Sequence, residues 1–381
     1  MDASEPILSS ETSPRHDEEP IRVAQIIGKM VGGGVESVVM NYYRHVDRSR
    51  VQFDFLVDAD STRVPTEEIR SLGGRVFEIP PYQHPVAYRK ALLRLFRAER
   101  WTIIHSHINT LSVFPLSAAK AAGVPVRIAH SHSTMGKGEY GKNLMKLALR
   151  PFATIYPTHR FACSNYAGVW LFGESAFTVI PNAIELRDFR FSERTRQEVR
   201  SELGLASDTL LIGHVGRFVP QKNQLFLVNV LAQVLEQAPK TMLAFVGDGP
   251  EKESVIEYVK KLGIQDRVLF LGQRSDVNRL YQAFDVFCLP SIYEGLPLVG
   301  IEAQRSGLPC FFSNAVSREV DITGSVEFLP VNSTDDWVES LRECNVTKRL
   351  TFSDQVFDSY DIDKQGETLT DLYERLYFAS R

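Results

Sequence analysis

Residues 210–237 read LLIGHVGRFVPQKNQLFLVNVLAQVLEQ, and the fold class follows from the pattern in this stretch. The apolar run Leu210–Val215 predicts a buried strand, and the spacing of apolar residues over Asn223–Gln237 predicts an amphipathic helix. Two cations, Arg217 and Lys222, lie in the turn between them. A strand that leads through a short loop into a helix is half of a βαβ unit, so the stretch predicts a parallel sheet.

The same alternation recurs on both sides of this stretch. Before it, we expect strands at Arg22–Gly28, Val51–Val57, Arg75–Ile79, Thr102–His105 and Val126–Ala129, with helices at Val35–His45, Tyr88–Glu99 and Ser112–Ala122. After it, we expect strands at Met242–Val246, Val268–Leu271, Val286–Leu289 and Pro309–Ser313, with helices at Glu251–Leu262, Val277–Phe284 and Pro297–Ser306. Two such sets predict an α/β protein of two doubly wound, Rossmann-like domains that face each other across a cleft.

Composition and pattern breaks predict the domain boundaries. We expect a disordered acidic tail over residues 1–20, an N-terminal Rossmann-like domain over 21–185 and a C-terminal one over 186–360. A final helix is expected within 361–381, and Val179–Phe191 is the expected linker region.

Composition excludes several classes of protein. With 381 residues, 44% of them hydrophobic and 24% charged, the chain is not a disordered protein, a coiled coil or a disulfide-stapled miniprotein. No apolar run approaches the roughly 18 residues of a membrane span, and residues 1–20 do not resemble a secretory signal. Because the four cysteines are far apart and form no C-x-x-C, we expect a cytoplasmic protein.

The formal net charge of −4 averages unlike segments. Residues 1–20 are acidic, with one basic and six acidic residues. Residues 21–180 are basic, with 20 basic and 11 acidic residues, and residues 181–381 are acidic again, with 22 basic and 30 acidic residues. From Pro85 to Trp170 there are 12 basic residues and two acidic ones. Such a stretch is either an ordinary solvated surface or a face for an anionic ligand or membrane, and the sequence leaves both open.

In an open parallel sheet, ligands bind beyond the carboxyl ends of the strands. Arg217 and Lys222 follow the strand at 210–215, and their charges suit phosphate oxygens. Glu294 follows the strand at 286–289, and Glu302 lies in the next helix. A loop carboxylate can accept from sugar hydroxyls, and a helix N-terminus can hold a phosphate without a metal. Taken singly, each residue also has an ordinary structural role available to it.

Strand ends in the N-terminal half carry glycines and histidines. Gly32, Gly33 and Gly34 do not form the dinucleotide fingerprint G-x-G-x-x-G, but they allow a backbone to approach a ligand closely. The sequence HSH occurs at 105–107 and at 130–132, and strand alternation places both histidines of a pair on one side. Each histidine either bonds a sugar hydroxyl or fills the core.

Two further readings concern metals. The paired histidines permit a zinc or iron site, although no acidic residue lies at short spacing beside them. Asp58-Ala59-Asp60 has the form of the DxD of metal-dependent sugar transferases, and its alternative is a solvent-exposed loop.

The run EGLPLVGIE at 294–302 resembles the E-x7-E motif of retaining glycosyltransferases of family 4, which have the GT-B fold. Supporting segments appear in the family's order: GGGVE at 32–36, HSH at 105–107, IPNAI at 180–184, GRFVPQKN at 216–223, GDGP at 247–250 and EAQRSGLPC at 302–310. The similarity covers nearly all of Ile21–Tyr377. The segments HSHINTLSVFPL and RIAHSHST are closest to the exopolysaccharide and capsule branch.

The resemblance implies roles for individual residues. Arg217 and Lys222 would neutralise the donor diphosphate, Glu294 and His130 would contact the transferred sugar, and Glu302 would bind the ribose. The expected catalytic residues are Arg217, Lys222, Glu294 and His130. The expected donor-binding residues are Gly33, Gly34, Gly216, Arg217, Lys222, Gly247, Gly295, Leu298 and Glu302, and those expected to contact acceptor or sugar are His105, His107 and His132. Ala183 and Gly300 depart from the family pattern, and we expect them to affect packing more than chemistry.

The resemblance also implies a reaction. A hexose or N-acetylhexosamine would pass, with retention, from a nucleotide sugar, expected to be a UDP-sugar, to a lipid-linked saccharide. The C-terminal domain would bind the donor and the N-terminal domain the acceptor, with the last helix packing back on the N-terminal domain. No metal or other cofactor and no nucleic acid are expected. The basic stretch would face anionic lipid, as a peripheral contact at the inner membrane face.

Other functions remain open at this point. A GT-B epimerase or phosphorylase would act on the nucleotide sugar itself, without an acceptor. A catalytically silent partner would keep the fold, although intact Arg217, Lys222, Glu294 and Glu302 argue against it. A metallohydrolase would require bound metal.

Overall fold

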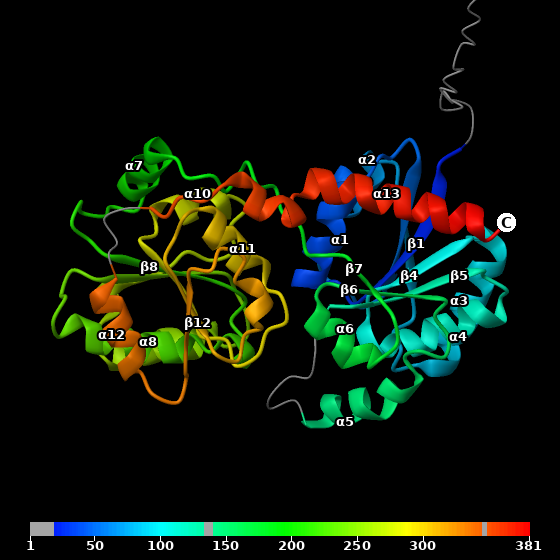
Figure 1. Cartoon of the computed structure of the whole chain (residues 1–381). Helices are drawn as coiled ribbons and strands as arrows, with labels where there is room; N and C mark the ends of the chain where they lie inside the picture. Colours follow the sequence, from blue (N-terminus) through cyan, green and yellow to red (C-terminus); the bar gives the residue numbers. More distant parts are fainter. Residues whose placement is uncertain (1–18, 133–139, 345–348) are drawn as a thin grey trace, which may run out of the picture.

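The structure is a computed structural model that describes residues 19–132, 140–344 and 349–381. Two parallel sheets stand side by side, and helices cover each of them (Figure 1). The acidic tail predicted over residues 1–20 lies outside the described residues except for its last two positions.

The first sheet has seven strands in the order β3-β2-β1-β4-β5-β6-β7, and every neighbouring pair is parallel. Its strands are β1 (Ile21–Gly28), β2 (Val51–Asp58), β3 (Arg75–Ile79), β4 (Ile103–Ser106), β5 (Val126–Ser131), β6 (His159–Ala162) and β7 (Thr178–Val179).

The second sheet has six parallel strands in the order β10-β9-β8-β11-β12-β13. Its strands are β8 (Leu211–Val215), β9 (Met242–Val246), β10 (Val268–Phe270), β11 (Val286–Leu289), β12 (Cys310–Ser313) and β13 (Val326–Leu329). The chain winds outward from β1 in the first sheet and from β8 in the second, then reverses, which is the doubly wound order. The predicted fold class is confirmed.

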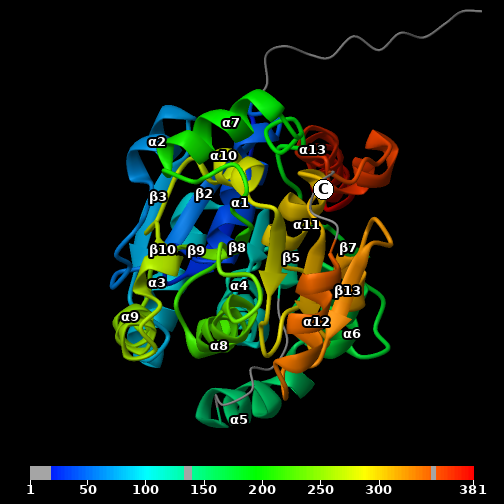
Figure 2. The ribbon, with the colours of Figure 1, turned by 90° about the vertical axis from the view of Figure 1, so that its left-hand side faces the viewer.

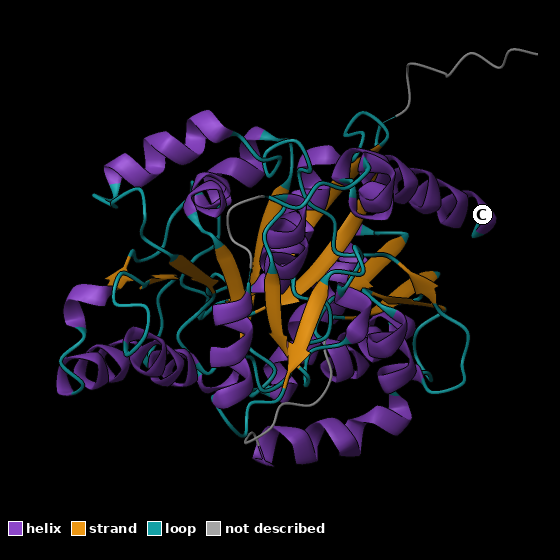
Figure 3. Cartoon of the chain, turned by 60° about the vertical axis from the view of Figure 1, so that its left-hand side comes forward, coloured by secondary structure: helices purple, strands orange, loops and turns teal. Residues whose placement is uncertain are grey.

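The helices lie on both faces of each sheet (Figure 3). They are α1 (Gly34–His45), α2 (Thr66–Ser71), α3 (Pro85–Glu99), α4 (Val113–Ala121), α5 (Tyr140–Leu149), α6 (Asn165–Phe172), α7 (Glu193–Glu202), α8 (Gln224–Leu235), α9 (Lys252–Lys261), α10 (Val277–Ala283), α11 (Leu298–Arg305), α12 (Asp335–Glu343) and α13 (Ile362–Ala379). Within the described ranges, no helix is both long and apolar enough to cross a bilayer.

Each sheet lies between two apolar layers. In the first sheet, one core contains buried side chains of α1, α2 and α13, and the other contains those of α3, α4 and α6. In the second sheet, α7, α10 and α11 supply one core and α8, α9 and α12 the other. Figure 2 shows these two groups of helices on opposite sides of the sheet. Because both faces of the strands are covered, the strands read as continuous apolar runs.

The last helix, α13, lies along the first sheet although it follows the second sheet in sequence (Figure 1). Its Tyr373 is buried in the same core as α1 and β2. Gly366 meets the end of α1 so closely that a Cβ there would lie 2.6 Å from the carbonyl oxygen of His45. The chain crosses twice between the sheets. The two crossing segments are joined by an isolated parallel β-bridge between Ile184 and Asp361.

Candidate functional site

Each sheet has one point at which the strand order reverses, between β1 and β4 in the first and between β8 and β11 in the second. Ligands of doubly wound sheets bind beyond the strand ends at this point. A pocket of about 450 Å³ lies beside these points, between the loops that follow β1, β2, β8, β9 and β10. It is lined by Val31, Gly32, Thr62, Arg63, Arg217, Gly247, Asp248, Gly249, Pro250 and Gln273.

The loops after β8 and β9 interlock at this pocket. The backbone N–H of Phe218 donates to the carbonyl oxygen of Asp248 at 2.9 Å. Gly247 has φ +139°, and a Cβ on it would lie 2.1 Å from the carbonyl oxygen of Gly216. Only glycine fits there, because both the backbone angle and the contact exclude a side chain. This contact fixes the backbone of the loop after β8, in which the side chain of Arg217 is exposed and lines the pocket.

The loops after β8 and β11 are joined by three hydrogen bonds that hold the backbone around Lys222 beside Glu294. Asn223 Nδ2 donates to the carbonyl oxygen of Pro290 at 3.2 Å, and Gln221 Nε2 donates to that of Tyr293 at 3.0 Å. The third bond, of 2.9 Å, runs from the N–H of Ile292 to the carbonyl oxygen of Gln221.

Lys222 and Glu294 meet as an ion pair, with Nζ 2.5 Å from Oε1. The two side chains are only 16% and 12% exposed. Arg217 has no side-chain partner among the residues that the structure describes. One cation of the predicted site is therefore held in place, and the other projects into the pocket.

Glu302 lies on α11 and accepts a hydrogen bond of 2.8 Å at Oε2 from the hydroxyl of Tyr281 on α10. Burial of the Glu302 carboxyl raises its pKa to about 7, and the Tyr281 hydrogen bond offsets part of that rise. Leu298, at the start of the same helix, packs against cores of both sheets. Gly295 also lies at the boundary, because a Cβ on it would be 3.6 Å from the carbonyl oxygen of His132.

The glycine loop after β1 is held by Glu36. Its two carboxylate oxygens accept the backbone N–H groups of Val31 at 2.9 Å and Gly32 at 2.7 Å. Gly33 precedes α1 and Gly34 begins it, with open space where a Cβ of Gly34 would point. The loop therefore presents its backbone to the pocket at Val31 and Gly32, whereas the predicted donor-binding residues Gly33 and Gly34 are not among the lining residues.

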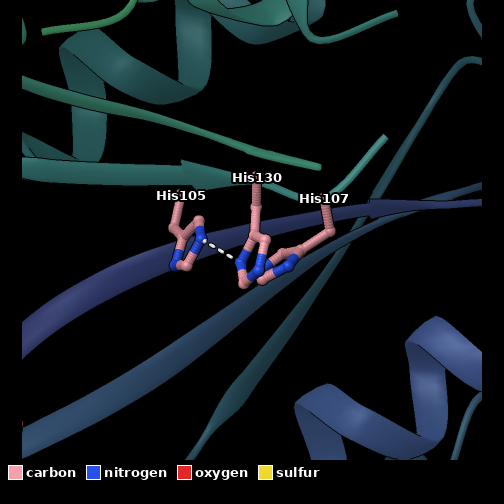
Figure 4. Close-up of side chains that lie close together, drawn as sticks. All are labelled: His105, His107 and His130. Atoms are coloured by element: carbon pink, nitrogen blue, oxygen red, sulfur yellow. Dashed lines mark hydrogen bonds between the residues drawn. The ribbon is translucent and has the colours of Figure 1, made fainter. Parts of the chain in front are cut away.

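The four predicted histidines gather at the carboxyl ends of β4 and β5, and Figure 4 shows three of them, His105, His107 and His130. His105 Nε2 lies 3.0 Å from His130 Nδ1, and His107 Nδ1 lies 2.9 Å from His132 Nε2. The other ring nitrogens of His105 and His107 bond Tyr373 and Gln25 at 2.6 and 2.8 Å. With both nitrogens engaged, neither His105 nor His107 can bond a sugar directly unless one of these bonds breaks.

One ring nitrogen from each of His105, His107 and His130 lies within 4.8 Å of the others, so the donor set would suit a zinc ion. However, only His130 Nε2 among them has no partner in the described chain, so a metal would displace existing hydrogen bonds. The DxD pair has a different environment. Asp60 pairs with Lys29 at 2.6 Å, and burial raises the pKa of Asp58 to about 6.

Sequence reasoning missed five residues that support the site. Arg63 and Gln273 line the pocket from opposite sheets and bond each other, and Tyr281, Gln25 and Tyr373 hold the predicted acid and histidines. Gln25 did carry a signal, because it is a polar residue inside the apolar run of β1, whereas α10 reads VNRLYQA and is too polar for Tyr281 to stand out. Arg63 carried no signal either, since its loop lies far from the second sheet in sequence.

Both halves of the chain match known family models. Residues 33–183 match the glycosyl transferase 4-like domain, and residues 195–344 match glycosyl transferases group 1.

Individual relatives agree with these matches. The chain is 37% identical over 310 residues to the putative glycosyltransferase EpsF of Bacillus subtilis (strain 168), covering 79% of this chain and 81% of that protein. It is 27% identical over 300 residues to the Escherichia coli UDP-Gal:alpha-D-GlcNAc-diphosphoundecaprenol alpha-1,3-galactosyltransferase, covering 74% and 78%. The solved structure of Anabaena Alr3699/HepE with UDP and glucose superposes with a TM-score of 0.77 at 18% identity, over 93% of this chain and 99% of that one.

Proposed function

Because the chain belongs to the group 1, family 4 glycosyltransferases of the GT-B fold, we propose that it transfers a hexose or N-acetylhexosamine from a UDP-sugar to a lipid-linked saccharide. The proposed setting is exopolysaccharide or capsule biosynthesis, the branch to which the name EpsF points. The acceptor class follows the E. coli relative, whose name specifies a diphosphoundecaprenol-linked sugar.

The contact between Lys222 and Glu294 carries this proposal. It places a cation suited to a diphosphate beside a carboxylate suited to sugar hydroxyls, at the point where the strand order reverses. In our proposal the donor displaces Lys222 from Glu294, so that the ammonium binds phosphate and the carboxylate binds sugar. Arg217 adds a second cation from the pocket, and Glu302 accepts the ribose hydroxyls.

The proposed reaction retains the anomeric configuration. The acceptor oxygen bonds to the anomeric carbon as the bond from that carbon to the β-phosphate oxygen breaks, and the departing phosphate takes the acceptor's proton. Negative charge grows on the β-phosphate, and Arg217, Lys222 and the N-terminus of α11 would stabilise it. His130 would orient the sugar.

A donor panel tests the proposal. Purified protein with a diphosphoundecaprenol-linked acceptor is assayed for UDP or GDP release from UDP-Glc, UDP-Gal, UDP-GlcNAc, UDP-GalNAc and GDP-Man. We expect acceptor-dependent UDP release from one UDP-sugar and a product with the donor's anomeric configuration, read by NMR. UDP release that needs no acceptor would favour the epimerase or phosphorylase, and an inverted product would contradict the retaining reaction.

We further propose that α3 contacts an anionic membrane. Its exposed cations Arg89, Lys90, Arg94 and Arg97 have no side-chain partner within the described residues. They surround apolar groups of the same face, including Val86, which is 82% exposed. Near an anionic surface each such cation contributes about 1 kcal/mol. Lys137, in the same basic stretch, lies outside the described residues.

Liposome sedimentation tests this contact. We expect the double variant Arg94→Gln/Arg97→Gln to bind phosphatidylserine vesicles roughly tenfold or more weakly than the unchanged chain. The matched control is Arg194→Gln/Lys240→Gln, which removes two exposed cations of the second sheet's helices and loops. Equal loss in both variants, or none in the first, would contradict a membrane contact through α3.

A further inference from the structure

The four buried histidines form two hydrogen-bonded branches that meet at Gln25 on β1. One branch runs through Tyr373 and His105 to His130, and the other runs through His107 to His132. At the two far ends, His130 Nε2 and His132 Nδ1 are buried and have no hydrogen-bond partner among the described residues. The network is otherwise complete, so these two atoms are its open ends.

Burial keeps all four rings neutral. It lowers the pKa of His132 to about 3 and the pKa values of His105, His107 and His130 well below the usual range, and neighbouring rings lower the values of these three further. A neutral imidazole has one N–H and one lone pair, so the bond made by one nitrogen determines what the other offers.

The first branch has a single consistent direction. The Tyr373 hydroxyl bonds two groups of the described chain, Gln25 Nε2 at 3.1 Å and His105 Nδ1 at 2.6 Å. The amide nitrogen can only donate, so the hydroxyl proton finds its acceptor at His105 Nδ1. His105 then carries its proton on Nε2 and donates to Nδ1 of His130. His130 is left with its proton on Nε2, and the open end of this branch is a donor.

The second branch ends with the opposite character. Gln25 Oε1 can only accept, so His107 donates to it from Nε2 and offers a lone pair at Nδ1. His132 donates to that lone pair from its own Nε2, and its Nδ1 is left as an acceptor. The His130 and His132 rings stack with centroids 3.9 Å apart, so the open donor and the open acceptor belong to neighbouring rings.

We propose that Gln25 and Tyr373 are positioning residues that fix the tautomers of His130 and His132, so that the two rings together bind one sugar hydroxyl. A hydroxyl is the simplest group that can both accept from an N–H and donate to a lone pair. The backbone at His132 lies beside Gly295, next to the carboxylate that we assign to the sugar. The sugar part of this inference rests on the proposed function, whereas the tautomers do not.

NMR of the free protein tests the tautomers directly. With 15N-labelled histidine, we expect His130 and His132 to carry their protons on Nε2 in the unchanged chain. Tyr373→Phe removes the donor to His105, so an Nδ1-protonated form of His130 should appear while His132 is unchanged. Gln25→Met removes the acceptor of the second branch, so His132 should lose its single tautomer. His130 protonated on Nδ1 in the unchanged chain, or tautomers unaltered in both variants, would overturn the proposal.

Kinetics test the hydroxyl. For Tyr373→Phe we expect the KM for the UDP-sugar to rise about fivefold to tenfold while the Kd for UDP, which has no sugar, stays the same. Tyr43→Phe is the matched control. This variant also removes a buried hydroxyl from a tyrosine that packs on Phe53, but the Tyr43 hydroxyl bonds Gln52 and not a histidine. Monodeoxy donors should show that the KM effect vanishes when one particular hydroxyl is absent.

Two outcomes separate this inference from the proposed function. If no UDP-sugar is a substrate but the tautomers shift as expected, the function fails and the network stands. If transfer occurs and Tyr373→Phe alters neither the tautomers nor the KM, the inference fails. It also fails if Tyr373→Phe weakens the binding of UDP as much as it raises the KM for the UDP-sugar. Zinc that copurifies with the unchanged chain at one per molecule and is lost in His130→Ala would also overturn it, since the metal would occupy the lone pairs.

Discussion

At the scale of single residues, the two cations of the site differ in how they are held. Lys222 is largely buried and paired with Glu294, whereas Arg217 is exposed and lies in the pocket without a side-chain partner in the described chain. Removing one member of a buried pair leaves the other charge uncompensated, but removing an exposed charge costs little stability. The two residues can therefore share a chemical role and still differ in their effect on the fold.

We expect Arg217→Gln to lower kcat about 10²–10³-fold with an unchanged Tm, because it removes only stabilisation of the leaving phosphate. Lys222→Met should lower kcat by a similar factor and also lower the Tm by several degrees, because Glu294 loses its partner. Turnover and differential scanning calorimetry measure the two effects. Lys240→Met, whose exposed pair with Asp208 lies elsewhere, is the control and should change neither. An equal Tm for both site variants would contradict this distinction.

The binding of UDP should depend on pH through Glu302. The pKa of this carboxyl in the free protein is about 7, so its acceptor form prevails above that pH and is lost as the pH falls. Ribose hydroxyls that donate to it favour the charged form and lower its pKa in the complex. We therefore expect the Kd for UDP to rise up to roughly tenfold per pH unit below pH 7, measured by calorimetry. Glu302→Gln should bind more weakly and lose this dependence, and a dependence that persists in Glu302→Gln would assign it to another group.

At the scale of elements, the central strands could be predicted because burial on both faces requires continuous apolar runs. The helices that the sequence did not reveal include α7, whose sequence ERTRQEVRSE contains one aliphatic residue, Val199. They also include α6, whose sequence NYAGVWLF is nearly all apolar and has no polar face to give a helical period. Strand β7 has only two residues, too few to show any alternation.

The glycine inside α11 is explained by the elements packed against that helix. The unusual Gly300 lies on α11, where a Cβ would come within 2.7 Å of Val320 and 3.1 Å of Phe312. The prediction that this departure concerns packing agrees with that contact, although its effect on chemistry stays a prediction.

The turn after β9 should tolerate no side chain. Gly247→Ala would place a Cβ 2.1 Å from the carbonyl oxygen of Gly216, and we expect a loss of more than about 3 kcal/mol in the free energy of unfolding. Gly263→Ala is the control, since it also has positive φ but open space around the Cβ, and it should cost about 1–2 kcal/mol. Urea unfolding measures both values. Equal losses would show that the backbone angle alone, not the contact, requires glycine.

At the scale of the whole molecule, the last helix of the chain belongs to the core of the first sheet. Leu369 and Tyr373 of α13 are buried with residues of α1 and β2, more than 300 positions earlier. Arg50, directly before β2, pairs with Asp371 at 2.7 Å and with Glu374. The histidine network depends on the same helix, because Tyr373 of α13 bonds both His105 and Gln25. The site is therefore complete only when α13 packs against the first sheet.

We expect Leu369→Ala to lower the free energy of unfolding by about 2–5 kcal/mol, because it leaves a cavity under α13. Hydrogen exchange read by mass spectrometry should show the lost protection in β1 and β2. Leu231→Ala on α8 is the matched control, since the same truncation there should affect β8 and β9. If Leu369→Ala weakened the second sheet as much as the first, α13 would not belong to the core of the first sheet.

The sequence by itself determined the fold class, the position of most strands along the chain and the charged residues at the strand ends. These features are local, because apolar runs, turn glycines and the spacing from Glu294 to Glu302 can be read along a single segment. Only the tertiary structure decided which of these side chains meet. The contact of Lys222 with Glu294 depends on two loops 72 residues apart, and that of Gln25 with Tyr373 on two ends of the chain. Such pairings arise from packing of distant elements, which leaves no periodic signal in the sequence.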